Sequence, residues 1–385
     1  MNRKSMAGLV VATAMFAGVA FAPYQVSVVL ASDGVAEEGE GEAGQVEFHG
    51  YGEVHYNNPK LDTMSKGAGN EADFHRFVVG WEYEFTDELR VEGEIDFEHA
   101  ATEIELEEAF LEYDLAPALS VRAGTLLMPV GPLNEFHQPP LYYSVERPYV
   151  QRYIIPTTWQ ENGVGLAGRA VEGALSYRVY LTVGLDAVGI TALGGLHDVS
   201  TKGAESKADD LAGVGRLEYS PSQGITLGAS GYYGGADQKT PGLGQVTLGI
   251  ASADARYHRA GLDLRGVFVR TALDGADSVS AFVGETIGQA MQGWYVEAAY
   301  DLLRRDAREE GGRSLVLFAR HEDFDTNEQV PAGLLKIPAA TRSVTSGGLS
   351  YYPVERVALK ADYEHWRDGA DAKLDRVNLG AAFMF

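Results

Sequence analysis

The sequence predicts an all-β fold: a transmembrane antiparallel β-barrel of about sixteen strands, with a long third loop folded into the lumen. Three observations predict it. Segments of about ten residues alternate in polarity, as in strands that face lipid on one side and water on the other. The connections between these segments alternate between short and long. The chain also ends in an alternating segment that terminates at Phe385.

The N-terminus predicts export. A basic start is followed by an apolar run over residues 6–22, which is typical of a secretory signal peptide. Cleavage after Ala31 is favoured, and cleavage after Ala22 is the alternative, so residues 1–31 are assigned to the signal. Residues 32–44 are acidic and glycine-rich and are expected to form a disordered leader. The barrel is assigned to residues 45–385.

Composition excludes several classes of protein. No later stretch approaches the roughly 20 apolar residues of a membrane helix. The net charge of −24 argues against nucleic-acid binding, which needs basic patches. The chain has no cysteine, which excludes disulfides, thiolate metal sites and cysteine nucleophiles.

Residues 89–99 illustrate the alternation. The odd positions from 89 to 97 are Leu, Val, Gly, Ile and Phe, and every even position from 90 to 98 is charged. Such a segment is apolar on one face as a strand, whereas a helix would scatter its charges. Comparable segments, of which 103–115 is the least regular, are predicted at 45–56, 73–85, 89–99, 103–115, 119–128, 163–170, 174–186, 211–220, 224–236, 246–258, 261–271, 292–303, 313–324, 343–352, 355–367 and 374–385.

The rims of the barrel differ. Short turns such as 86–88 and 116–118 alternate with long loops such as 129–162 and 187–210. Outer-membrane barrels have short periplasmic turns and longer external loops, so both termini are expected on the periplasmic side. Outward aromatic residues recur where strands reach the short-turn rim and predict one interfacial girdle, formed by Tyr83, Phe85, Tyr113, Tyr219, Tyr257, Tyr300, Tyr351 and Phe385.

The last strand resembles an assembly signal. Phe383 and Phe385 end an alternating segment, as in substrates of the bacterial barrel-assembly machinery. The alternative is an ordinary strand that happens to end in Phe. Together with the signal peptide and the girdle, the feature predicts insertion into the outer membrane of a Gram-negative-type bacterium, with outer-membrane lipid as a partner.

Sixteen strands enclose a lumen too wide for side chains to fill, which predicts an aqueous channel. Opposed basic and acidic patches would set up a transverse field, although most of these charges taken singly could simply solvate the wall. The predicted lining residues are Arg76, Arg90, Glu92, Glu94, Asp96, Glu98, Arg122, Arg178, Arg216, Arg256, Lys360 and Asp362. Glu47, His49, Glu53 and His55 share one face of the first strand but spread over about 20 Å, so no metal site is predicted.

The loop 129–162 contains six prolines and many aromatic residues. A stiff, amphipathic loop is expected to pack on a surface, and the inner wall of the barrel is the favoured one. A cap outside the barrel, or a bridge to a neighbouring subunit, is the alternative. Folded inward, the loop would bring to a constriction Glu135, His137, Glu146, Arg147, Arg152 and Glu161.

Several runs carry a family resemblance: RAGT at 122–125, PVG at 129–131, ERP at 146–148, IIPTTW at 154–159, GVG at 163–165 and GWYVEA at 293–298. In these runs the chain resembles the porin superfamily that includes the phosphate-selective O/P type. The resemblance implies a 16-stranded barrel, a homotrimer and a constricting third loop. Phosphate selectivity is not carried over, because phosphate-specific members are expected to carry many lumen lysines and this chain has nine lysines in all.

The sequence therefore predicts a passive outer-membrane channel for small polar solutes or ions, with a slight preference for cations and no cofactor. An outer-membrane barrel enzyme of the lipase or protease type is the first alternative, but no G-x-S-x-G motif supports it. A structural or adhesive barrel is the second, and its longest loops should be polar. The chain is expected not to be an enzyme.

Overall fold

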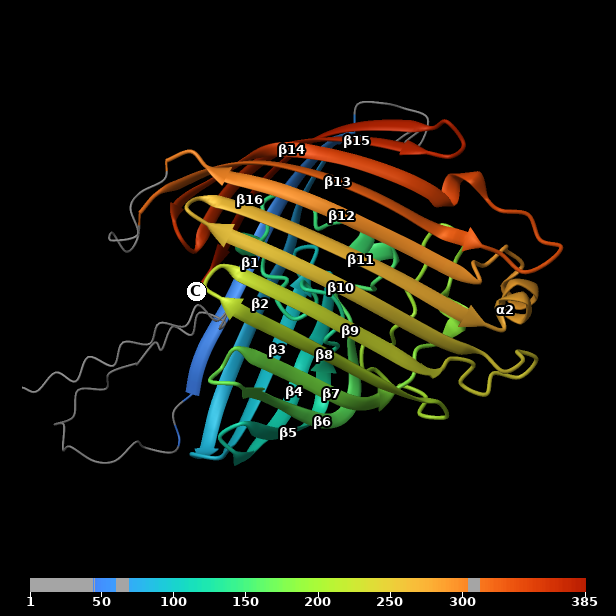
Figure 1. Cartoon of the computed structure of the whole chain (residues 1–385), viewed down its shortest axis with the longest axis horizontal. Coiled ribbons are helices and arrows are strands. Elements are labelled where there is room, and N and C mark those ends of the chain that lie inside the picture. Colours follow the sequence, from blue (N-terminus) through green and yellow to red (C-terminus); the bar gives the residue numbers. More distant parts are fainter. Residues whose placement is uncertain (1–43, 45, 60–68, 304–311) are drawn as a thin grey trace, which may run out of the picture.

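A computed structural model describes residues 44, 46–59, 69–303 and 312–385. Sixteen antiparallel strands are hydrogen-bonded in sequence order, and β1 pairs with β16, so the sheet is a closed barrel (Figure 1). The predicted fold class is confirmed in its all-β, antiparallel, 16-strand architecture. The predicted signal peptide at 1–31 lies outside the described residues, as does all of the leader except Gly44.

The strands match the predicted segments one for one. The first eight are β1 (Val46–Pro59), β2 (Glu71–Thr86), β3 (Leu89–Glu98), β4 (Glu103–Ala116), β5 (Leu119–Leu127), β6 (Gln160–Ala170), β7 (Leu175–Val183) and β8 (Leu211–Ser222). The other eight are β9 (Ile225–Gly235), β10 (Thr247–Arg259), β11 (Leu262–Asp274), β12 (Ala290–Asp301), β13 (Ser314–Gln329), β14 (Thr341–Val354), β15 (Val357–Asp368) and β16 (Lys373–Met384). The largest difference is at β13, which runs to Gln329, whereas the prediction ended at 324. Residues 325–329 are all polar, so the alternation that marks a strand in the sequence stops before the strand does.

Short helices lie only in the connections of the described chain. α1 (Val150–Tyr153) and the 3-10 turn η1 (Pro139–Leu141) follow β5, and α2 (Ala276–Val283) lies between β11 and β12. Gly275 and Gly284 flank α2 with φ of 83° and 78°, a conformation that glycine adopts without strain. No helix among the described residues has the length and apolarity to cross a membrane.

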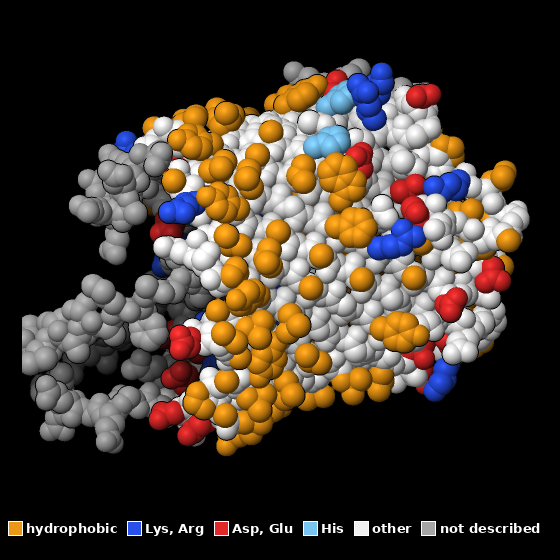
Figure 2. Space-filling model, viewed as in Figure 1, with side chains coloured by type: hydrophobic (Ala, Val, Ile, Leu, Met, Phe, Trp, Pro, Cys, Tyr) orange, Lys and Arg blue, Asp and Glu red, His pale blue; other side chains and the backbone are white. Residues whose placement is uncertain are grey.

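The two faces of the wall differ in chemistry. On β15, Leu359 and Tyr363 are 48% and 46% exposed, whereas Lys360 and Asp362 between them are both 5% exposed. We call the face with the exposed apolar side chains the outer face and the other the inner face. Hydrophobic side chains spread over the outer face in Figure 2, and most charges lie toward its two ends. An apolar outside and a polar inside are the pattern of a transmembrane barrel.

Several neighbouring strands show register shifts, and two of these bulges affect which side chains reach the inner face near the β5–β6 connection. Between β1 and β2 the register passes from Glu53–Arg76 to Val54–Phe74, which leaves His75 without an opposite residue. Between β3 and β4 it passes from Glu94–Glu108 to Ile95–Leu106, which leaves out Glu107. A bulge turns two consecutive side chains toward one face. This explains why the segment 103–115 looks irregular in sequence.

Candidate functional site

The candidate site comprises the inner face of the wall and the connection between β5 and β6, residues 128–159, here called the β5–β6 segment. Much of the segment is buried, including Met128, Tyr149, Val150, Ile155 and Trp159. A buried connection must find partners for its backbone N–H and carbonyl groups. In this protein, charged side chains of the wall supply them.

Strands on one side of the barrel anchor the middle of the segment. The Lys360 ammonium donates to the carbonyl groups of Pro139 at 2.6 Å and Ser144 at 2.9 Å. Asp362 accepts from the backbone N–H of Val145 at 2.6 Å. Lys360 and Asp362 therefore lie on the predicted inner face, but the segment covers them, and they hold the chain rather than line open space.

Two buried arginines extend this anchoring. Arg76 donates to the carbonyl of His137 at 3.0 Å and pairs with Glu53 at 2.9 Å. Arg320 on β13 donates to the Ser144 hydroxyl at 2.5 Å and pairs with Glu322 at 3.1 Å. Each guanidinium thus joins a wall carboxylate to the segment, and the charge is compensated where it is buried.

Aromatic packing holds the C-terminal half of the segment. Trp159 meets Tyr232 of β9 edge-on with ring centroids 5.2 Å apart, and Tyr149 meets Trp366 of β15 at 4.2 Å. Asn134 joins the two ends of the segment, because its side-chain amide donates to the carbonyls of Met128 at 2.8 Å and Trp159 at 2.7 Å. The segment is therefore held by strands on several sides of the barrel.

Two cavities lie beside residues 132–141, and Phe136 and Leu141 line both. The larger, of 240 Å³, has Glu92, Glu94 and Glu108 as well as Arg122, Arg169 and Arg178 among its lining residues. Carboxylates from β3 and β4 and arginines from the neighbouring strands β5, β6 and β7 thus line the same cavity.

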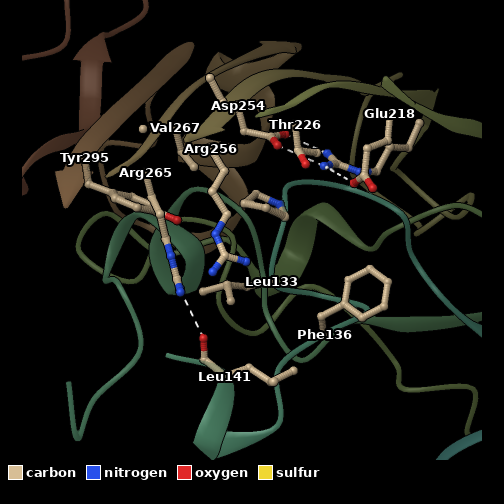
Figure 3. A pocket seen from close by; sticks show the side chains of 14 residues that line it. Leu133, Phe136, Leu141, Glu218, Thr226, Asp254, Arg256, Arg265, Val267 and Tyr295 are labelled. Carbon is tan, nitrogen blue, oxygen red and sulfur yellow. Dashed lines mark hydrogen bonds and ion pairs between the residues drawn. The ribbon is translucent and has the colours of Figure 1, made fainter. Parts of the chain in front are cut away.

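The smaller cavity, of 90 Å³, is lined by Arg216, Arg256 and Arg265 together with the apolar Leu133, Phe136 and Leu141 (Figure 3). Its arginines are paired. Arg216 contacts Asp254 at 2.7 Å, and Arg256 and Arg265 share Asp263 at 2.6 and 2.8 Å. Arg265 also donates to the Leu141 carbonyl at 3.1 Å, which ties the segment to β11.

The six residues predicted at the constriction have different surroundings. Glu135 lines the larger cavity and pairs with Arg178 at 2.9 Å. His137 is buried beside Tyr51 and Glu107, with 2.7 Å to the tyrosine oxygen. Arg147 donates to Thr158 within the segment at 3.0 Å. Glu161 is 1% exposed and accepts from the Trp159 indole at 3.1 Å.

Glu146 and Arg152 contact neighbouring connections and strands. Glu146 accepts from Asn57 at 2.8 Å and lies 3.9 Å from Arg376. Arg152 donates to His197 at 3.0 Å, in the connection between β7 and β8. That connection also donates from the Leu196 N–H to the Tyr153 carbonyl at 2.9 Å, so it packs over α1.

Burial and neighbouring groups shift the pKa values of two side chains in the segment. Burial lowers the pKa of His137 below its ordinary value, against the opposing effect of Glu107. Burial alone would raise the pKa of Glu146, but the hydrogen bond and charge of His55, with Arg376 and Asn57, hold that pKa well below its usual range. At neutral pH the segment therefore carries a neutral imidazole and an ionised carboxylate.

The other predicted lining residues lie on the inner face of β3 and in the pairs named above. Asp96 is buried, Glu98 is partly exposed at the end of β3, and Arg90 contacts Glu112 and, at 3.0 Å, Asp114. Arg122 also contacts Glu112. The six predicted inner-face arginines therefore each contact a carboxylate.

Sequence reasoning missed several residues that build the site. Arg320 and Glu322 are two apart in a predicted strand, so alternation could have assigned them to the inner face. Glu107 is hidden by the bulge, which breaks the period of two. No pattern in the sequence marks Asn134, because its role depends on how the two ends of the segment meet in the fold.

Comparisons place the fold among known barrels. No protein-family model matches the chain. An uncharacterized protein of Aquifex aeolicus (strain VF5) is 34% identical over 355 residues, which cover 87% of this chain and 79% of that one. The anion-selective porin of Comamonas acidovorans has a TM-score of 0.59 at 10% identity and covers 89% of this chain and 100% of that one.

A second solved structure is the in-vitro folded outer membrane protein OmpT of Vibrio cholerae in its trimer form. Its TM-score is 0.55 at 12% identity, covering 89% of this chain and 100% of that chain. At such identities the likeness concerns the fold, which is that of outer-membrane porins. The specific resemblance to the phosphate-selective O/P type stays a prediction.

Proposed function

Because the chain belongs to the same family as the Aquifex aeolicus protein and has the fold of outer-membrane porins, we propose that it forms a water-filled channel in the outer membrane. Small polar or charged solutes would cross it by passive diffusion, down their concentration gradients. We also propose that the chain is not an enzyme. The inner-face charges would then act on passing solutes and not on a reaction.

The observation that carries the proposal is the pair of cavities beside residues 132–141. Both are lined in part by ionisable side chains of the wall, and the larger is lined by carboxylates and arginines together. Polar walls favour water and dissolved ions over apolar ligands. A site for an apolar molecule would instead present mostly hydrophobic side chains with a few polar groups.

We propose that the β5–β6 segment is the constriction of the channel. Its backbone contacts to β11, β13 and β15, together with its aromatic contact to β9, support a position within the lumen. Glu135 is the member of the predicted constriction set that lines the larger cavity. It is therefore our choice for the group that solutes meet.

We expect a slight preference for cations. Carboxylates outnumber basic groups in the chain, with 55 Asp and Glu against 31 Lys and Arg, and the anionic Glu135 faces the larger cavity. The arginines of the same cavity would let anions pass as well. A preference for phosphate is not proposed.

The setting of the channel is also part of the proposal. The apolar outer face and the rim aromatics Phe85, Tyr113 and Tyr257 fit a barrel held in outer-membrane lipid. The terminal Phe383 and Phe385 fit recognition by the barrel-assembly machinery. A homotrimer is proposed because the fold is shared with a barrel that has a trimer form.

The test is single-channel conductance of the refolded protein in a planar bilayer, with the reversal potential measured in a salt gradient. Stepwise openings with a cation-selective reversal potential are expected. Glu135→Gln should shift that potential toward anions. Glu172→Gln, in an exposed short turn, is the matched control and should leave it unchanged.

A folded barrel without conductance would overturn the proposal. In that case lipase and protease assays would test the enzymatic alternative, and binding of the external loops to surfaces would test the structural one. A reversal potential that Glu135→Gln does not move would instead reject Glu135 as the selectivity group and leave the channel standing.

A further inference from the structure

Three histidines gather near the long-loop rim of β1, β2 and β3. His55 stacks on His75 with ring centroids 4.6 Å apart and an interplanar angle of 14°. His75 meets His99 edge-on at 5.5 Å. The channel proposal gives no role to His75, His99 or the neighbouring Asp73.

The polar atoms of this cluster converge on one point. The Nδ1 atom of His75 lies 3.2 Å from Asp73 Oδ2, and the Nδ1 atom of His99 lies 2.7 Å from the same oxygen. One ligand atom each from Asp73, His75 and His99 lies within 4.8 Å of the other two. The two imidazoles and the carboxylate therefore share a single focus.

The pairing of β1, β2 and β3 brings these side chains together. Asp73 lies opposite His55 in the ladder, so its side chain shares the inner face. His75 lies two residues after Asp73 and therefore projects to the same side by alternation. Because of the bulge at His75, the next residue, Arg76, also turns inward. Across β3, the His99 N–H donates to the His75 carbonyl at 3.0 Å, which sets the two imidazoles side by side.

The donor set fits a transition-metal ion. Two neutral imidazoles and one carboxylate are common ligands of Zn²⁺ and neighbouring divalent ions. Ligand atoms at about 2.0–2.1 Å from a tetrahedral ion lie roughly 3.3 Å apart, so the observed 2.7 and 3.2 Å need only small adjustments. A water or chloride would complete the fourth position.

The surroundings favour a cation and leave the focus accessible. The His99 side chain is 45% exposed and that of His75 33% exposed. Glu98 and Glu103 flank the turn that carries His99, and with Glu105 they form an acidic group. Lys202 binds Glu105 at 2.6 Å and offsets part of that charge. Arg76, the nearest guanidinium in sequence, is paired with Glu53.

We propose that Asp73, His75 and His99 form a binding site for a divalent transition-metal ion at the long-loop rim of the barrel, with Zn²⁺ as the representative ion. The site needs only the folded wall, so it does not depend on whether the barrel conducts. The acidic group beside it would raise the local cation concentration without acting as the ligand set.

The experiment is a calorimetric titration of ZnCl₂ into the refolded full chain in detergent, prepared without a polyhistidine tag. One Zn²⁺ per barrel is expected. His75→Gln and His99→Gln should each weaken binding by at least about tenfold. His321→Gln removes an exposed histidine that also pairs with a carboxylate, Asp323 at 3.4 Å, and should leave binding unchanged.

A second measurement uses the unaltered protein, so that misfolding of a variant cannot decide the matter. Zn²⁺ should protect His75 and His99 from modification by diethylpyrocarbonate, with the sites read by mass spectrometry. Absence of protection would overturn the proposal. So would CaCl₂ that binds as tightly as ZnCl₂ and still binds both histidine variants, because binding would then belong to the acidic group.

Discussion

Lys360 illustrates how single side chains hold the β5–β6 segment. Its ammonium has two carbonyl partners, and the side chain also lies over the Tyr142 ring at 3.9 Å from the centroid. Asp362 two residues later binds a backbone N–H of the same segment. β15 thus places a donor and an acceptor two residues apart on the same face. Together they pair with both kinds of backbone group, the carbonyl and the N–H.

Lys360→Met should loosen the segment without altering the barrel. Methionine keeps most of the side-chain volume but leaves two buried carbonyl groups unpaired, at a cost of about 1–3 kcal/mol. Amide exchange of residues 139–145 should rise by roughly tenfold or more, measured by mass spectrometry. Lys239→Met, which removes an exposed lysine paired with Asp209, should have no effect. Unchanged exchange in the Lys360 variant would contradict the anchoring role.

The β5–β6 segment contributes Phe136 and Leu141, which line both cavities. Leu133 N–H donates to the Gln151 side chain at 3.3 Å, so the two ends of the stretch 133–150 lie close together. Sixteen paired strands close the wall independently of this connection. The segment can therefore be shortened while the wall keeps its hydrogen bonds.

Deleting residues 133–150 should widen the channel. The two cavities would merge, and conductance in planar bilayers should rise by about twofold or more, because flow follows the narrowest cross-section. Shortening the exposed connection at residues 332–335 is the control and should leave conductance near that of the parent chain. Equal conductance of the deletion variant and the parent, in assembled barrels, would reject the constriction.

β16 completes the barrel by pairing with β1. The Phe385 N–H donates to the Gly50 carbonyl at 2.9 Å, and the Gly50 N–H donates back to Phe385 at 3.1 Å. The rings of Phe383 and Phe385 lie 6.3 and 6.4 Å from that of Phe77 on β2. The last residue therefore joins the closing hydrogen bonds and an aromatic cluster across the seam.

Removal of Phe385 should slow assembly. The variant loses two backbone hydrogen bonds at the seam and the terminal aromatic ring, so the yield of heat-modifiable barrel in the outer membrane should fall severalfold. Phe385→Tyr keeps the backbone and an amphipathic ring and should restore the yield. A normal yield after removal would count against an assembly signal at this terminus.

The alternation of polarity in the sequence predicts the wall: sixteen strands, their order, and the face on which most residues lie. These follow from a period of two, which is a local property of the chain and survives small errors in strand ends. The exceptions, His75 and Glu107, lie at bulges, where the period breaks.

What each inner-face residue contacts depends on how distant parts of the chain pack together. Lys360, Asp362 and Arg76 share a face with Arg178 and Arg256, yet the first three anchor the β5–β6 segment and the last two line cavities. Asp73 and His99 meet only because β2 and β3 pair. Such roles depend on contacts between residues far apart in the chain, which the alternation of one strand does not encode.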